Sequence, residues 1–211
     1  MKTALIWGAG GGIGRALVAQ LSEHGWTVIA IARHATALSV LTPYTLEADV
    51  ASTYDVEVAV QAASQIADEV NLWIYAAGDI VPAKVADMSP AEWQRTLNAN
   101  LSGAFITTHF SLPLLSADAH LFYLGALSER LRLPGFAAYG AAKAGLEAFA
   151  ESLAKEQRRR KVTVVRPGAV ATPFWEKVPL RMPESALPTE IIAERLLAAY
   201  EQRTAGVLDI S

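Results

Sequence analysis

A tyrosine and a lysine stand four residues apart in the segment YGAAK, at Tyr139 and Lys143. Residues four apart lie on one face of a helix, so the phenol and the ammonium can contact the same ligand. A free phenol has a pKa of about 10, which is too high for proton exchange near neutral pH. An ammonium about 4 Å away, at an effective dielectric of about 20, contributes roughly 4 kcal/mol and lowers that pKa by about three units. The pair is therefore predicted to act as an acid and base.

A glycine-rich turn near the start of the chain predicts a nucleotide site. The segment WGAGGGIGR follows the apolar run TALIWG and precedes apolar residues at helical spacing. The common spacing GxGxxG is absent, whereas Gly8, Gly12 and Gly14 fit GxxxGxG. Such glycines allow a tight turn, a close approach of the backbone to a pyrophosphate, and a helix N-terminus that faces its charge. We therefore expect a dinucleotide cofactor.

The residues after the second strand-like run indicate which dinucleotide is bound. An acidic side chain there would hold the adenosine ribose hydroxyls, but this chain has Ala32 and Arg33. A 2′-phosphate would meet no carboxylate and could bind the guanidinium of Arg33. NADP(H) is therefore favoured over NAD(H), although exposed arginines at strand ends are also common.

Strand-like and helical segments alternate along the chain, and this alternation must position the chemical groups. Four runs are apolar on both sides, as in a parallel sheet covered by helices: WTVIAIA, NLWIYAAG, HLFYLGA and KVTVVRPG. Ser89 is predicted to cap one helix, and further helices are expected from about Phe136 and Thr189. We predict an α/β fold, with one Rossmann-type domain over residues 1–211 whose doubly wound parallel sheet is flanked by helices on both faces.

One long segment, 173–188, has the irregular sequence PFWEKVPLRMPESALP, whose prolines oppose regular structure. Loops of this length in compact domains are commonly lids or disordered. Phe174, Trp175, Val178 and Leu180 favour a small lid over the substrate.

The composition excludes several classes of function. With 211 residues, 52% hydrophobic content and a net charge of −3, the chain offers no general attraction to nucleic acid or to an anionic membrane. The basic run 158–161 is better explained as cations at a helix end. Cysteine is absent and the four histidines lack the spacing of metal ligands, so no metal site is expected.

Two further features of the sequence indicate where in the cell the protein is expected. The stretch 96–117 carries no charge, but its asparagines, threonines and proline favour a buried helix over a membrane span. A strand-like run follows Met1 almost at once, where a signal peptide would have a charged and then an apolar region. A cytoplasmic protein is therefore expected.

Together these motifs resemble those of the short-chain dehydrogenases/reductases. Besides the glycine turn and YGAAK, the chain has DV at 49–50, AAG at 76–78, NLSG at 100–103 and RPGAVATP at 166–173. The resemblance covers almost the whole chain in the family's order. It implies a Rossmann fold and an NAD(P)-dependent oxidoreductase.

The resemblance implies a role for each matched position. Tyr139 would donate or accept the proton, Lys143 would hold the nicotinamide ribose and bias Tyr139, and Asn100 would interrupt its helix to support a proton relay through water. Asn100 could instead be a buried amide at a kink, and Thr172 a turn residue. The residues expected to bind the cofactor are Tyr139, Lys143, Gly8, Gly12, Ile13, Gly14, Arg33, Asp49, Val50, Ala77, Gly78, Gly168, Val170 and Thr172.

The chain departs from the family at a position that matters for catalysis. The family usually has a serine thirteen residues before the tyrosine, where this chain has Ala126, and Ser128 is either a substitute or a solvated loop residue. Loss of one such donor costs about 3–4 kcal/mol, or roughly 10²–10³ in rate. Dihydropteridine reductases are similar in lacking this serine and in having an aromatic residue, here Trp7, before the first glycine.

Two functions follow as alternatives. We expect an NADP(H)-dependent oxidoreductase that transfers a hydride to or from a small carbonyl or conjugated C=N substrate, with Tyr139 as the acid/base. The alternative, favoured by Ala126, is a non-catalytic NADP(H)-binding sensor or a partner-binding module. In either case the apolar helices within 96–117 and after Tyr139 predict a homodimer or homotetramer.

Overall fold

The structure confirms the predicted α/β fold. In this computed structural model, which describes residues 2–211 apart from the side chain of Ser128, seven parallel strands form one sheet in the order β3-β2-β1-β4-β5-β6-β7. The strands are β1 Thr3–Trp7, β2 Thr27–Ala32, β3 Tyr44–Glu47, β4 Val70–Tyr75, β5 Leu115–Leu124, β6 Lys161–Pro167 and β7 Gly206–Ile210. The strand order reverses between β1 and β4, which is where ligands bind in sheets of this kind.

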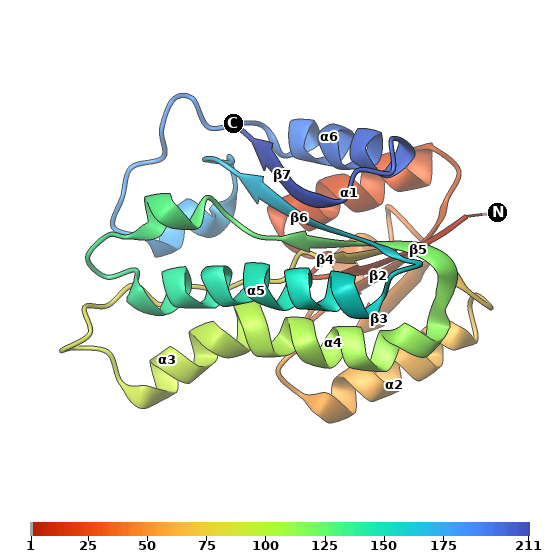
Figure 1. Cartoon of the computed structure of the whole chain (residues 1–211), viewed down its shortest axis with the longest axis horizontal. Coiled ribbons are helices and arrows are strands. Elements are labelled where there is room, and N and C mark those ends of the chain that lie inside the picture. The colour runs from red at the N-terminus through yellow and green to blue at the C-terminus, as the bar shows by residue number, and fades with distance from the viewer. Residues whose placement is uncertain (1) are drawn as a thin grey trace.

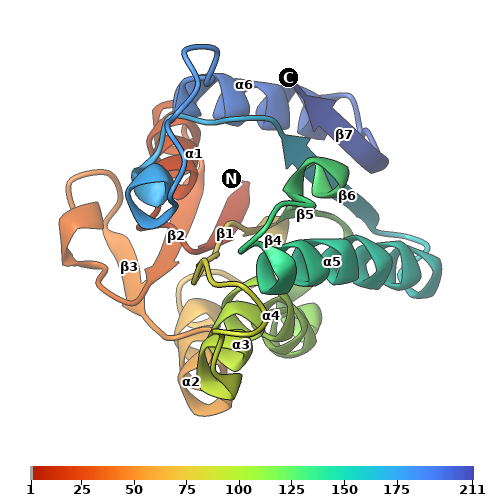
Figure 2. The same ribbon diagram turned by 90° about the vertical axis from the view of Figure 1, so that its left-hand side faces the viewer.

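Helices cover both faces of the sheet, as Figures 1 and 2 show. One face carries α1 (Gly12–Glu23) and α6 (Thr189–Glu201). The other face carries α2 (Thr53–Ser64), α3 (Pro90–Leu97), α4 (Gly103–Ser111) and α5 (Ala137–Glu156). The sheet is therefore doubly wound, as predicted.

Strand β1 shows why the strands are apolar on both sides. Successive side chains of a strand point to opposite faces of a sheet. Ala4 and Ile6 pack with residues of α1 and α6, whereas Leu5 and Trp7 pack with residues of α2, α4 and α5. All four are completely buried. Each strand residue thus contributes to one of two separate hydrophobic cores.

The predicted start of α3 is confirmed in detail. The Ser89 hydroxyl accepts a hydrogen bond from the Glu92 amide at 3.2 Å, and the Ser89 amide donates to the Glu92 carboxylate at 2.8 Å. Pro90 occupies the first helical position. This reciprocal capping fixes where the helix begins and hence the direction in which it leads the chain toward Asn100.

The charge-free stretch 96–117 differs from the single buried helix that was expected. It contains the end of α3, a π-helical segment Asn98–Ser102, all of α4, and the first residues of β5 from Leu115. Pro113 lies between α4 and β5, where a proline opposes continuation of a helix. Among residues 2–211, no helix combines the length and apolarity needed to cross a membrane.

The sequence analysis also missed one strand. β3 pairs with β2 at the edge of the sheet, and its four residues YTLE are exposed or only partly buried. An edge strand with so little buried surface has no continuous apolar run, so its sequence resembles a loop.

The basic run 158–161 follows the end of α5, as expected. Arg160 donates hydrogen bonds to the main-chain carbonyls of Leu112, Leu115 and Ser116. These carbonyls lie where the α4 region ends and β5 begins, so this arginine satisfies main-chain acceptors of the fold.

The carboxyl ends of the parallel strands meet at the left-hand edge of the sheet in Figure 1. The glycine turn, the AAG segment, the loop between β5 and α5, and segment 173–188 all follow strands at this edge. The segments that carry the sequence motifs are therefore gathered in one place.

Candidate active site

A cavity of about 920 Å³ opens at this edge of the sheet. Every residue predicted to bind the cofactor lines it, from Arg33 at the end of β2 to Tyr139 on α5. Asn100 is the exception among the predicted site residues, because it is completely buried behind the cavity wall. Among the described residues, no group of three or more histidine, aspartate or glutamate side chains is arranged to hold a metal ion.

The glycine turn joins β1 tightly to α1. Gly8 has a φ of +80°, and a Cβ atom there would collide with the backbone of Ala77. A Cβ atom on Gly14 would collide with the carbonyl oxygen of Gly8. These two positions require glycine, because strand, turn and helix lie in direct backbone contact.

The N-terminus of α1 fits the phosphates of a dinucleotide. Gly11 precedes the helix and supplies no side-chain cap, and the first turn contains no acidic residue. Gly10, Gly11 and Gly12 line the cavity. Free main-chain N–H groups and the positive end of a helix dipole are suited to an anion.

The far end of the cavity lies beside Arg33, Asp49 and Val50. The Arg33 side chain is exposed. The Ala35 amide donates to the Glu47 carboxylate at 3.0 Å, which ties the segment after β2 to β3. The Asp49 carboxylate accepts from the Ala51 amide at 3.0 Å. Sequence reasoning missed the bracing role of Glu47, since β3 itself was not predicted.

Tyr139 and Lys143 lie together near the start of α5, as their spacing predicted. The Lys143 ammonium donates to the Leu124 carbonyl at 2.7 Å and lies 5.6 Å from the centre of the Tyr139 ring. Only 3% of Lys143 is exposed, and burial lowers its pKa to about 8.

The expected lowering of the Tyr139 pKa is wrong for the free protein. Burial raises the pKa of the Tyr139 phenol above its usual value. Helical spacing brings Lys143 to the same face, but its ammonium is held by the Leu124 carbonyl. The cost of burying a phenolate therefore outweighs the attraction of that ammonium.

Asn100 lies in the π-helical segment between α3 and α4, so the predicted interruption of its helix is present. Its Nδ2 donates to the Thr96 carbonyl at 2.8 Å and to the Asp79 carbonyl. Its Oδ1 is buried without a hydrogen-bond partner. A Cβ atom on Gly78 would lie 3.0 Å from that Oδ1 and 3.9 Å from the Lys143 Nζ. An unpaired buried oxygen close to an ammonium is suited to holding a bridging water.

Tyr75 supports this arrangement from β4. Its hydroxyl donates to the Ala99 carbonyl at 2.8 Å, which connects the strand to the π-helical segment. Here a buried phenol, whose pKa burial raises, makes the connection from strand to helix.

Ala126 lines the cavity and has no side-chain donor. The suggestion that Ser128 replaces the missing serine falls outside the described residues, because it depends on that side chain. Apolar side chains gather near the reacting groups. Ile80, Phe136 and Val178 form a small cluster there, with Phe174 and Trp175 packed against it.

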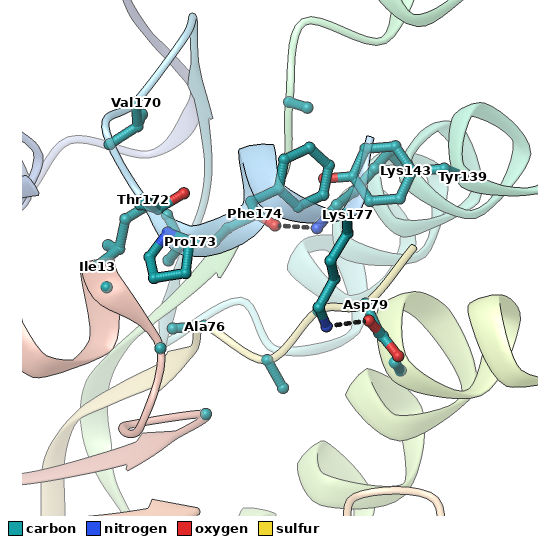
Figure 3. Close-up of a pocket in the computed structure, with 18 of the residues that line it drawn as sticks. Ile13, Ala76, Asp79, Tyr139, Lys143, Val170, Thr172, Pro173, Phe174 and Lys177 are labelled. Atoms are coloured by element: carbon teal, nitrogen blue, oxygen red, sulfur yellow. Dashed lines mark hydrogen bonds and ion pairs between the residues drawn. The ribbon is translucent and has the colours of Figure 1, made fainter. Parts of the chain in front are cut away.

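Segment 173–188 begins with a 3-10 helix, Pro173–Lys177, that lies over this part of the cavity (Figure 3). The Phe174 ring centre is 5.4 Å from that of Tyr139, and the Trp175 indole donates to the Val170 carbonyl at 2.7 Å. Lys177 reaches across to Asp79, at 2.6 Å. Sequence reasoning predicted a lid but missed Asp79 and Lys177, because residues 98 positions apart carry no local signal.

Similarity to known proteins shows the family of the chain. Residues 2–182 match the family described as short chain dehydrogenase. The chain belongs to the short-chain dehydrogenase family. It is 29% identical, over 185 residues, to an uncharacterized oxidoreductase of Staphylococcus epidermidis, a match that covers 83% of this chain and 80% of the relative. An uncharacterized oxidoreductase of Staphylococcus aureus is 28% identical over 182 residues, covering 81% and 79% of the two chains.

Solved structures agree with the short-chain dehydrogenase fold. A short-chain dehydrogenase/reductase described as glucose/ribitol dehydrogenase, from Brucella melitensis, has a TM-score of 0.91 at 26% identity, covering 100% of this chain and 94% of that one. A 3-ketoacyl-(acyl-carrier-protein) reductase from the same organism, in complex with NADH, has a TM-score of 0.89 at 22% identity, covering 99% and 96%. These findings support an oxidoreductase of this family, which uses NAD(P)(H), and do not support the narrower resemblance to dihydropteridine reductases.

Proposed function

We propose that the chain is a cytoplasmic, NADP(H)-dependent oxidoreductase that transfers a hydride to or from a small carbonyl or conjugated C=N substrate, with Tyr139 as the acid/base. The observation that carries the proposal is the position of Tyr139 and Lys143 on the wall of the same cavity as the glycine turn. A site that only binds a nucleotide needs no paired phenol and ammonium beside an apolar pocket.

The cofactor would be held by the chain's own anion-binding groups. The glycine turn and the N-terminus of α1 are suited to the pyrophosphate, and Arg33 is suited to a 2′-phosphate. The bound nicotinamide supplies or accepts the hydride. NADP(H) is preferred because Arg33 stands where a carboxylate would otherwise disfavour the added phosphate.

Tyr139 would transfer the proton. This partly buried phenol, whose pKa burial raises, stays protonated at neutral pH, so it can donate to the substrate oxygen or nitrogen as negative charge develops there. The Lys143 ammonium is the nearby cation that would stabilise the resulting phenolate. A water held by the Oδ1 of Asn100 would then lead a proton back toward this pair.

Ala126 restricts which substrates react well. Position 126 offers no second donor beside the hydrogen bond that Tyr139 would give to the substrate oxygen. A missing donor of this kind costs about 10²–10³ in rate. Substrates that spread the developing charge over a conjugated system lose least, and the aromatic wall of Phe136, Phe174 and Trp175 suits their flat, apolar bodies.

Ala126 also favours a second candidate, a non-catalytic NADP(H)-binding sensor or partner-binding module. The two functions differ in one measurement. Purified protein is titrated with NADPH and NADH, and loss of reduced-nucleotide absorbance is then followed with ketones, quinones, conjugated imines and quinonoid dihydropteridine. Turnover of any class supports the reductase, whereas tight nucleotide binding without turnover of any class supports the sensor.

We also propose that the protein forms a homodimer or homotetramer through α4 and α5. Phe105 on α4 is 54% exposed and meets Phe149 of α5 edge to face, with ring centres 6.4 Å apart. Exposed aromatic surface of this kind is stabilised when a second copy of the chain covers it. Light scattering at several concentrations measures the assembly, and replacing Phe105 with lysine is expected to shift it toward the monomer.

A further inference from the structure

Asp79 occupies an unusual place beside the site. It follows the AAG segment after β4, and only 4% of it is exposed. One carboxylate oxygen accepts from Lys177 at 2.6 Å, and the other accepts from the Arg95 guanidinium at 2.7 and 2.9 Å. Burial alone would raise the pKa of this carboxyl. Lys177 and Arg95 outweigh that effect and hold the pKa below its usual range.

The three charged residues come from different parts of the fold. Arg95 lies on α3, Asp79 on the cavity floor, and Lys177 at the end of the 3-10 helix that begins the lid. The Lys177 pair is the ion pair that joins the lid to the floor among the described residues. Lys177 is 46% exposed and Asp79 only 4%, so the Lys177 end of the pair lies at the rim of the cavity, where solvent can reach it.

Asp79 also contacts the proposed proton relay. Its main-chain carbonyl accepts from Nδ2 of Asn100, and this bond helps to orient the amide so that its Oδ1 faces Gly78 and Lys143. One residue therefore binds the lid through its side chain and the relay through its backbone.

We propose that Asp79 is a positioning residue and that its ion pair with Lys177 is a latch that holds the lid over bound nucleotide. With the latch closed, Phe174 lies against Tyr139 and Thr172 packs on Gly12 of the glycine turn. Opening the latch frees the lid from the cavity floor. This inference rests on the proposed function, because the latched lid acts on a bound nucleotide.

The test compares two lid cations. Lys177→Gln removes the latch, Lys177→Arg keeps its charge, and Arg181→Gln removes an exposed charge from the same lid as the matched control. Lid opening in the free protein is measured as the rate of cleavage after Glu184 by a glutamate-specific protease, because all variants retain Glu184 and the residues on either side of it. Nucleotide release is measured by stopped-flow fluorescence of bound NADPH and NADH.

The latch predicts a specific pattern. Lys177→Gln should release nucleotide about tenfold faster, equivalent to roughly 1.4 kcal/mol, and its lid should be cleaved faster than that of the wild type. Lys177→Arg should stay within about twofold of the wild type because it keeps the charge that pairs with Asp79, and Arg181→Gln should do so because its exposed charge lies outside that pair. Raising the salt concentration should speed release from the wild type more than from Lys177→Gln, because salt screens an ion pair at the rim.

Two results would overturn the latch: equal behaviour of Lys177→Gln and Arg181→Gln, or tighter nucleotide binding by Lys177→Gln. The proposed function fails separately. If the wild type binds neither NADPH nor NADH, the nucleotide site is refuted, and lid cleavage of the free proteins still decides whether Lys177 holds the lid.

Discussion

His120 on β5 should make the stability of the protein depend on pH. The imidazole is completely buried, its Nε2 forms a 2.8 Å hydrogen bond with the Thr163 hydroxyl, and its Nδ1 has no partner. The Thr163 hydroxyl donates onward to the Thr204 carbonyl at 2.6 Å, so it accepts from the ring. Burial and, to a smaller extent, the nearby Arg203 lower the pKa of His120 from 6.5 to about 3.

The sign follows from proton binding. Below pH 6.5 His120 binds a proton in the unfolded chain but stays neutral in the folded chain until the pH approaches 3. Acid therefore favours unfolding. The loss of unfolding free energy is about 1.4 kcal/mol at pH 5.5 and roughly 2.7 kcal/mol at pH 4.5, relative to neutral pH. This contribution is fully present above the unfolded pKa and is lost as the pH falls toward the folded one.

The assay is urea unfolding at pH 7.5, 5.5 and 4.5, with the wild type compared to His120→Gln. The glutamine amide can still donate to Thr163 but does not titrate. The unfolding free energy of His120→Gln should fall less with acid than that of the wild type, by the amounts given above. His24→Gln, at an exposed position outside α4 and α5, should follow the wild type. Parallel curves for the wild type and His120→Gln would refute the reasoning.

Three further changes bear on the site. Gly78→Ala places a methyl group close to Oδ1 of Asn100 and Nζ of Lys143, so turnover at saturating nucleotide should fall at least tenfold, by about 1.4 kcal/mol or more in activation free energy. Arg33→Gln should weaken NADPH binding by about 10–100-fold in fluorescence titrations and leave NADH binding nearly unchanged, because only NADPH loses a charged hydrogen bond. Ala126→Ser should raise the rate with simple ketones by up to about 10²-fold and leave conjugated substrates much less affected; equal gains for both classes would contradict the role given to Ala126.

The sequence could predict which motifs lie together in the site, because each motif is a short continuous segment that can be recognised by itself. The glycine turn, the AAG segment and the segment with Thr172 follow apolar strands, Asp49 follows the edge strand β3, and parallel strands bring their carboxyl ends to one edge. Gly8, Asp49, Gly78 and Thr172 therefore reach one cavity, although they lie far apart in the chain.

Other features depend on contacts that no local pattern encodes. The sequence spacing placed Lys143 beside Tyr139, but the direction of the Tyr139 pKa depends on burial and on the bond from Lys143 to the Leu124 carbonyl. The pair between Asp79 and Lys177 joins residues that only the folded chain brings together. β3 was missed because an edge strand with little buried surface needs no apolar run.

The most direct test of the central claim is turnover by Tyr139→Phe with the best substrate found for the wild type. The phenyl ring preserves the contact with Phe174 and removes only the hydroxyl. At saturating NADPH, turnover should fall by at least about 10²-fold, the usual contribution of a positioned acid. Unchanged turnover by a variant that still binds NADPH would contradict the assignment of Tyr139 as the acid/base.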